Sequence, residues 1–169
     1  MNTTEQRIEA FFEIMRDITL SDGFMEWLTA SGYFTAPASS RFHGAYKGGL
    51  FDHSYSVTQM LVQMTERMPL EWDDPRSPRL VGMFHDLCKI AQYKLGPEIN
   101  PSHPQHGESS VWLLSQWYTL TSEETLCIRH HMGAYEVKQW YAFDQAIKKC
   151  PNTLWTHTAD MYASKVRGL

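Results

Sequence analysis

The sequence predicts an all-α protein that folds as a single domain. Its 169 residues fit one domain of ordinary size, and 43% of them are hydrophobic, enough for a substantial core. Almost every segment repeats its apolar residues with the 3.6-residue period of an amphipathic helix. No segment alternates apolar and polar residues convincingly enough to predict a β-sheet. These observations together favour a helical bundle.

The N-terminal part is predicted to form two helices and an irregular segment. A first helix over residues 4–18 is expected because its apolar residues share one face: Ile8, Phe11, Phe12, Met15 and Ile18. Ser21 is expected to cap a short second helix that ends at Gly32. Residues 37–49 are rich in Ser, Gly and aromatic residues, which predicts a loop. The Gly48–Gly49 pair favours a tight turn just before the next helix.

The remainder of the chain predicts further helices separated by polar or proline-containing segments. They are expected at residues 51–68, 78–90, 105–118, from a Thr121 cap to about Met132, 142–149 and 153–166. Residues 71–78 form a charged linker, and residues 93–104 contain three prolines and predict a loop. Thr121 and Glu124 have the spacing of a capping box, and Gly133 is suited to end that helix.

Charge and cysteine content limit the classes of partner and compartment. The net charge is −4, from 15 basic and 19 acidic residues, with no long basic run, so tight non-specific binding of nucleic acid has no support. The three cysteines are widely spaced and form no C-x-x-C pair, which suits reduced thiols. The N-terminus lacks the pattern of a signal peptide, and no apolar run is long enough to span a bilayer. We therefore expect a cytoplasmic protein without a membrane partner; a homo-oligomer is left open.

A His85–Asp86 doublet in an apolar helical stretch is the main chemical feature of the sequence. Burying an imidazole beside a carboxylate is costly unless a partner compensates both, and a divalent cation would do so. Several other histidines and one aspartate occupy helical positions and are possible partners: His53, His106, His130, His131, His157 and Asp160. Imidazole and carboxylate ligands without thiolate suit Mn, Fe, Co, Ni or Zn, and Mg where oxygen ligands dominate. Ligands drawn from several helices are a known way to build a metal site in a bundle.

The pattern of these residues resembles the HD-domain metal-dependent phosphohydrolase superfamily. Its H…HD…D signature is matched by His53, the His85–Asp86 doublet and Asp160. Four longer segments, in order along the chain, are also similar to bacterial members: Gly48-Gly49-Leu50-Phe51-Asp52-His53, His85-Asp86-Leu87-Cys88-Lys89, His106-Gly107-Glu108 and His131-Met132-Gly133. The resemblance covers about residues 41–165. It implies one HD-domain helical bundle over residues 1–169, with the helices of residues 1–40 packed on it.

The resemblance also implies a ligand set for one or two divalent ions. A primary ion would be held by His53, His85, Asp86 and Asp160. His106 and His131 match positions that bind a second ion in multi-metal members, with Asp86 then bridging the two ions. Some subfamilies use a His-His pair at the last position, so His130 stays an alternative to His131, which is ranked first. His157, three residues before Asp160, is interpreted as structural.

The implied activity is hydrolysis of a phosphate ester by a metal-activated water, the substrate being a nucleotide or a related small phosphorylated molecule. Asp86, Lys89 and His130 are the candidate catalytic residues: Lys89 would hold a phosphate or pair with Asp86, and His130 would donate a proton to the leaving group. The candidate phosphate contacts are His43, Lys47 and Arg129. Relatives that act on nucleoside 5′-monophosphates tend to have an acidic residue where this chain has Lys89. Two alternatives remain: a di-iron oxygenase with the same fold, and a non-catalytic helical module stabilised by metal.

Overall fold

The computed structural model describes residues 1–93, 106–135 and 140–169, and these residues form helices and no strands. The α-helices are α1 (Thr4–Ile14), α2 (Phe24–Ala30), α3 (Gly49–Arg67), α4 (Ser77–Phe84), α5 (Lys89–Tyr93), α6 (His106–Ser115), α7 (Ser122–Arg129), α8 (Trp140–Lys149) and α9 (Asn152–Met161). A 3₁₀ turn covers Gly133–Tyr135, and a π-helical turn, Tyr162–Val166, follows α9. The prediction of an all-α fold is confirmed.

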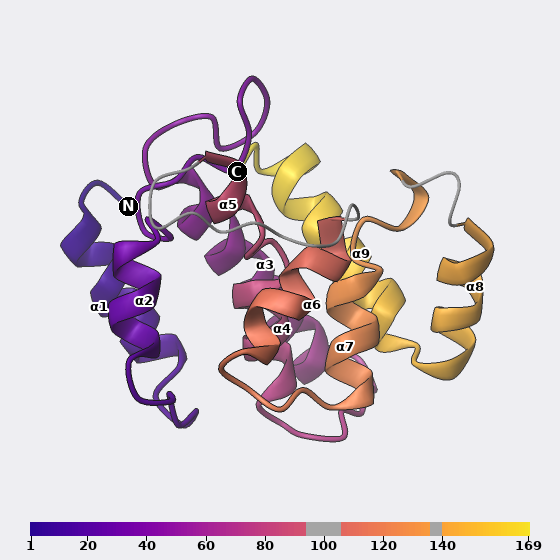
Figure 1. Cartoon of the computed structure of the whole chain (residues 1–169). Coiled ribbons are helices and arrows are strands. Elements are labelled where there is room, and N and C mark those ends of the chain that lie inside the picture. The colour runs from indigo at the N-terminus through magenta and orange to yellow at the C-terminus, as the bar shows by residue number, and fades with distance from the viewer. Residues whose placement is uncertain (94–105, 136–139) are drawn as a thin grey trace.

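Helices α3 and α4 pack against each other in the middle of the molecule, and α6, α7 and α9 surround them (Figure 1). Gly82 allows α3 and α4 to approach closely: a Cβ atom at this position would lie 2.6 Å from the Cα of Thr58. One cluster of buried apolar side chains runs from Phe11 in α1 to Ala163 after α9. Helices α1 to α7 and α9 therefore share one core.

The N-terminal helices pack onto this core through a buried ion pair and a group of aromatic rings. Arg7 of α1 donates two hydrogen bonds to Asp52 of α3, at 3.0 Å from Nε and 2.8 Å from Nη2. Phe11, one turn after Arg7, contacts Phe84 at the end of α4 edge-to-face. The expected apolar face of the first helix is wrong at Phe12, which is half-exposed, because Arg7 and Phe11 form the buried line of this helix.

The first two helices are shorter than expected. The first helix ends at Ile14 rather than at residue 18, and Thr3, not predicted as a cap, forms a capping box with Gln6. Ser21 does not cap the second helix. Gly23 precedes that helix with a left-handed backbone (φ 76°) and no side-chain cap, while the carbonyl of Ser21 accepts the N–H of Phe24 in a turn.

The turn predicted at Gly48–Gly49 is present. Gly48 has a φ of 86°, in the left-handed region that favours glycine. A Cβ atom on Gly48 would also lie 2.2 Å from the guanidinium carbon of Arg7. Glycine is therefore required here both by the backbone and by the buried Arg7–Asp52 pair.

The continuous helix expected over residues 78–90 is wrong. Helix α4 ends at Phe84, residues 85–88 form turns, and α5 begins at Lys89. In a continuous helix the carbonyl of Gly82 would accept the N–H of Asp86. Instead, it lies 2.8 Å from the Nδ1 of His85, so a side chain replaces the backbone donor and the helix stops at the doublet.

The later helices largely follow the prediction but differ at their ends. The capping box of α7 is confirmed: the Thr121 hydroxyl accepts from the N–H of Glu124 at 3.1 Å, and the Glu124 carboxylate accepts from the N–H of Thr121 at 2.8 Å. Helix α7 ends at Arg129, before residue 132, so His130 and His131 lie just beyond it. Gly133 has the expected left-handed backbone, with a φ of 51°.

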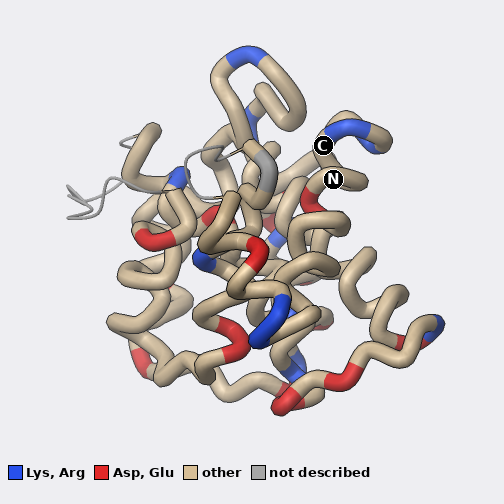
Figure 2. Tube along the Cα trace, turned by 90° about the vertical axis from the view of Figure 1, so that its right-hand side faces the viewer, with Lys and Arg blue, Asp and Glu red and all other residues tan. Residues whose placement is uncertain are grey.

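Helix α6 ends at Ser115 rather than at 118, and α8 begins at Trp140 rather than at 142. Most of the predicted loop 93–104 lies outside the described residues. Within the described part of the chain, no helix has both the length and the apolar character needed to cross a bilayer. Lys and Arg are interspersed with Asp and Glu along the trace in the view of Figure 2.

Candidate metal centre

The six residues proposed as metal ligands come together in the middle of the bundle, although they belong to five different parts of the chain. His53 lies in α3, His85 and Asp86 follow α4, His106 begins α6, His131 follows α7, and Asp160 lies in α9. His53, His85, Asp86 and His131 are buried, while His106 and Asp160 are partly exposed. His106 and Asp160 are therefore the members of the cluster that solvent reaches most easily.

Asp86 is the centre of the cluster, and its two oxygens face different pairs of histidines. Oδ1 lies 2.6 Å from Nε2 of His106 and 3.4 Å from Nε2 of His131. Oδ2 lies 3.4 Å from Nε2 of His53 and 3.5 Å from Nε2 of His85. One carboxylate thus stands between two imidazole pairs, the arrangement expected of a group that bridges two cations.

Asp160 of α9 completes the cluster. Its Oδ1 lies 3.2 Å from the Nε2 of His53. Three overlapping triplets of residues each have one donor atom per residue within 4.8 Å of the others: His53, His85 and Asp86; Asp86, His106 and His131; and His85, His131 and Asp160. The first two triplets share only Asp86, so the geometry has room for two ions as well as for one.

Backbone carbonyls fix the orientation of three of the imidazole rings. Each Nδ1 contacts a carbonyl oxygen: His53 that of Leu169 at 3.0 Å, His85 that of Gly82 at 2.8 Å, and His131 that of Ile128 at 2.7 Å. A carbonyl can only accept, so each Nδ1 carries the proton and each Nε2 presents a lone pair. These three lone pairs all point into the cluster.

Two features of this set of acceptors would be satisfied by a bound cation. The Nε2 atoms of His53 and His85 lie 3.2 Å apart, with both lone pairs on the facing side. The buried Nε2 of His131 has no hydrogen-bond partner among the described residues. Acceptors that face each other repel, and a buried acceptor without a partner is costly. A divalent cation bound to these atoms would remove both penalties.

The carboxylate at the centre is held in the anionic form that a metal requires. Burial alone would raise the pKa of Asp86, but the charge of Lys89 and the hydrogen bond with His106 hold it well below its usual range. A buried negative charge on Asp86 is therefore available to offset the charge of bound ions.

Two cationic groups balance Asp86 in the metal-free protein. Lys89 Nζ lies 2.6 Å from its Oδ2, at the start of α5. Burial would lower the pKa of His106, but its hydrogen bonds with Asp86 and Cys88 raise that pKa to about 10. At neutral pH His106 is therefore protonated, and binding a metal through its Nε2 displaces this proton.

The other residues predicted to take part in catalysis or phosphate binding lie at different distances from the cluster. The ring of His43 lies 5.3 Å from that of His53, centroid to centroid, and is half-buried at the edge of the cluster. Lys47 is exposed and interacts electrostatically with Glu5 of α1, so the structure does not bring it to the cluster.

Arg129 and His130 do not reach Asp86. Arg129 forms an ion pair with Glu108 of α6. His130 is buried at the end of α7, and burial followed by the charge of Arg129 lowers its pKa. Its ring makes no hydrogen bond or ion pair with the residues that the structure describes, whereas His131 lies 3.4 Å from Asp86. Of the two adjacent histidines, the geometry favours His131 as the ligand.

Two neighbours of the cluster were not predicted as part of the site. The sulfur of Cys88 lies 3.1 Å from the Nδ1 and 3.7 Å from the Nε2 of His106. His157 was interpreted from the sequence as structural. Its Nδ1 lies 2.8 Å from the carbonyl oxygen of His131, and because a carbonyl only accepts, Nδ1 is the donor. The signal for Cys88 was its place two residues after the doublet; the signal for His157 was its place on the same face as Asp160.

The arrangement of four imidazoles around two carboxylates is suited to one or two ions of Mn, Fe, Co, Ni or Zn, because imidazole outnumbers oxygen as a ligand. It is less suited to Mg, which prefers oxygen ligands and water. Searches against models of protein families, curated proteins and solved structures found no match for this chain.

Proposed function

We propose that this protein is a metal-dependent phosphohydrolase of the HD-domain type, which cleaves a phosphate ester of a nucleotide or related small molecule. The observation that supports the proposal most is the position of Asp86, whose two oxygens face separate pairs of histidines at 2.6–3.5 Å. A carboxylate between two ligand sets is the arrangement that two-ion hydrolysis of a phosphate ester requires.

Each residue of the cluster has a role in this proposal. When bound, the divalent ions lower the pKa of coordinated water toward neutrality and offset negative charge on the phosphoryl oxygens. His53, His85, Asp86 and Asp160 would hold one ion, and His106 and His131 would hold the second together with Asp86. The carbonyls behind the imidazole rings keep the Nε2 atoms aimed at the ions.

Lys89 and His43 are the residues proposed to contact the phosphate. The ammonium of Lys89 is 2.6 Å from Asp86 in the metal-free protein. Bound cations would neutralise Asp86 and so weaken its hold on Lys89, which leaves the ammonium available to a phosphate oxygen. His43 stands beside His53 at the edge of the cluster, within reach of a substrate bound there. Arg129, paired with Glu108, and exposed Lys47 are weaker candidates.

The first test is a joint measurement of metal content and phosphate release. Purified protein loaded with Mn²⁺ or Co²⁺ is assayed against a panel of nucleotides and model phosphate esters, and bound metal is counted by elemental analysis. Asp86→Asn should lose both bound metal and activity, because it removes a charge shared by both ions. Asp144→Asn on α8 is the matched control, since Asp144 is exposed and pairs with Lys148. An Asp86→Asn protein that retains full activity would exclude this centre as the site of hydrolysis.

A di-iron oxygenase is a second candidate, and the completeness of the six-ligand set favours it. Both His106 and His131 face the Oδ1 of Asp86, so a second ion would have two imidazole ligands. The buried Lys89 argues for the hydrolase, because an ammonium next to the ions suits a phosphate. Protein that contains iron, consumes O₂ with an organic substrate and releases no phosphate from any ester would favour the oxygenase.

A further inference from the structure

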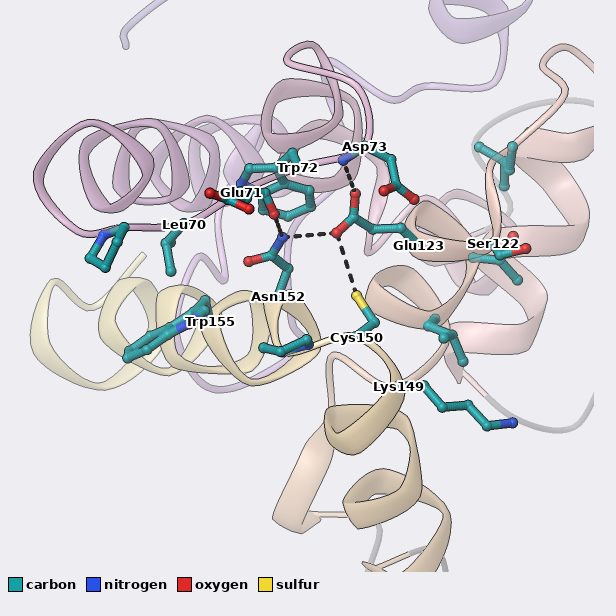
Figure 3. A pocket seen from close by; sticks show the side chains of 15 residues that line it. Leu70, Glu71, Trp72, Asp73, Ser122, Glu123, Lys149, Cys150, Asn152 and Trp155 are labelled. Carbon is teal, nitrogen blue, oxygen red and sulfur yellow. Dashed lines mark hydrogen bonds between the residues drawn. The ribbon is translucent and has the colours of Figure 1, made fainter.

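Figure 3 shows a surface cavity of about 1040 Å³ that lies apart from the metal centre. Its walls come from the segment after α3, from α7 and from the junction between α8 and α9. Cys150, at this junction, lines the cavity, while Cys127 of α7 is completely buried behind it. None of the six metal-type residues lines this cavity, so its chemistry is independent of the proposed hydrolase.

The two cysteines lie in van der Waals contact. Their sulfur atoms are 3.8 Å apart, although the residues are 23 positions apart in the sequence. The thiol of Cys150 also donates to the Oε1 of Glu123 at 3.6 Å. Because the Cys150 proton points toward Glu123, the Cys127 thiol is the one that donates to the sulfur of Cys150. The three groups therefore form a chain from Cys127 through Cys150 to a carboxylate.

Glu123 is held in place by the walls of the cavity, as Figure 3 shows. Its Oε1 accepts from Nδ2 of Asn152 at 2.8 Å, and its Oε2 accepts from the N–H of Asp73 at 2.8 Å. Asn152 is fixed in turn by the carbonyl of Glu71, 2.7 Å from its Nδ2. A carboxylate anchored in this way presents a fixed acceptor to the thiol of Cys150.

We propose that Cys127 and Cys150 are an oxidant-reactive thiol pair, with Cys150 as the attacking sulfur, Cys127 as the resolving sulfur and hydrogen peroxide as the oxidant. The Cys150 proton passes to Glu123, and the sulfur attacks one peroxide oxygen; the O–O bond breaks, a sulfenic acid forms, and one water leaves after protonation. The Cys127 sulfur then attacks the sulfenic sulfur. The S–S bond forms, the S–O bond breaks and a second water leaves. Two thiols are oxidised and one peroxide is reduced.

The surroundings of the two sulfurs suit these different roles. The hydrogen bond from Cys127 lowers the pKa of Cys150 against the effects of burial and of the Glu123 charge, and burial raises the pKa of Cys127. The sulfur that faces the cavity is thus the better nucleophile, and the enclosed one is protected until the first has reacted. A disulfide needs the sulfurs to close from 3.8 Å to about 2 Å.

The disulfide would join two segments that lie next to metal-type residues in the sequence. Cys127 lies in α7, four residues before His131, and Cys150 stands immediately before α9, which contains Asp160. Neither cysteine is one of the six metal-type residues. Oxidation therefore ties α7 to the start of α9 without using any of the six proposed ligands.

The test treats the full chain with hydrogen peroxide, with and without a metal chelator, and then counts thiols under denaturing conditions. The expected result is a fall from three free thiols to one, reversed by a dithiol reductant. Peptide mapping without reduction should find the Cys127–Cys150 disulfide, with Cys88 still free as an internal reference. Oxidation of Cys88 ahead of the pair, disulfides only between chains, or three thiols that persist while an exposed model thiol is consumed would overturn the proposal.

Variants separate the roles within the pair. Cys127→Ser should stop at a Cys150 sulfenic acid, which dimedone traps, whereas Cys150→Ser should lose the reaction altogether. Glu123→Gln keeps a hydrogen-bond acceptor but removes the base, so thiol loss should slow; Glu71→Gln is the matched control, because its exposed side chain lines the same cavity and only its carbonyl contacts Asn152. Equal rates in the two glutamine variants would remove Glu123 from the mechanism, and a trapped sulfenic acid on Cys127 would reverse the assignment of the two sulfurs.

Discussion

Loss of the Asp52 charge should strongly destabilise the protein, because it would leave the Arg7 guanidinium buried without a counter-ion. The side chains are only 4% and 6% exposed, and they are joined by two hydrogen bonds of 3.0 and 2.8 Å. Solvent screening is therefore weak, and removing one partner of such a pair costs about 3–5 kcal/mol. For a domain of this size about 1 kcal/mol shifts the melting temperature by about 2–4 °C, so Asp52→Asn should melt roughly 6–20 °C lower.

The assay is thermal and urea unfolding of the metal-free protein, with chelator present so that loss of metal does not contribute. Asp17→Asn is the control: Asp17 also pairs with an arginine, Arg79, but at the surface, where such pairs contribute little. A double variant, Arg7→Met with Asp52→Leu, removes both charges and should be less destabilised than Asp52→Asn. A single variant that loses less than about 1 kcal/mol, or a double variant whose loss equals the sum of the two single losses, would refute the reasoning.

The other predictions concern the metal centre and its packing. His106→Gln should halve the bound metal if two ions are held, measured by elemental analysis, because only the Oδ1 side of Asp86 loses a ligand; complete loss would contradict two separate sites. Metal affinity should rise about tenfold per pH unit between neutrality and about pH 10, because the ring of His106, with its pKa raised to about 10, must lose a proton to bind the metal. Calorimetry in two buffers of different ionisation enthalpy would detect the released proton. An affinity that does not change with pH would contradict this prediction. Lys89→Gln should raise KM for a phosphate substrate about tenfold or more, the worth of a charge-assisted hydrogen bond, while bound metal is unchanged; an unaltered KM would remove Lys89 from substrate binding. Gly82→Ala should cost about 1–3 kcal/mol in urea unfolding, because its Cβ would lie 2.6 Å from the Cα of Thr58, and wild-type stability would show that α3 and α4 separate easily.

The sequence was sufficient to predict the helical fold and the residues that meet at the centre. Helical periodicity depends on local spacing, which a sequence shows directly. The cost of burying imidazole and carboxylate groups pointed to the doublet, and the six residues were selected by their match to the segments of HD-domain proteins. The structure brings His53, His106, His131 and Asp160 to the doublet, whereas it leaves Lys47 at the surface and pairs Arg129 with Glu108.

The sequence could not predict which of several possible partners a polar side chain contacts in the folded protein. Apolar spacing favoured Phe12 over Arg7 on the inner face of α1, but Arg7 is buried because Asp52, 45 residues later, neutralises it. Cys127 and Cys150 were interpreted as separate reduced thiols, and only the packing of α7 against α9 brings their sulfurs together. Contacts between distant segments carry no periodic signal along the chain.

The break in the helix at the doublet connects the local structure with the chemistry of the centre. The Nδ1 of His85 takes the Gly82 carbonyl, so the backbone after Phe84 tightens into i→i+3 turns, among them the bond from the N–H of Lys89 to the carbonyl of Asp86 at 3.0 Å. Side chains three residues apart eclipse in such a turn, which places the Lys89 ammonium directly on the Asp86 carboxylate.

One hydrogen bond thereby has two effects on the same carboxylate. This bond aims the Nε2 of His85 at the cluster, where that atom faces the lone pair of His53. It also brings the ammonium of Lys89, three residues after Asp86, to the Asp86 carboxylate. A cation bound here, as proposed, would relieve the repulsion between the imidazole lone pairs and weaken the hold of Asp86 on Lys89. Part of the free energy lost by burying these groups would then be recovered as affinity for the cation.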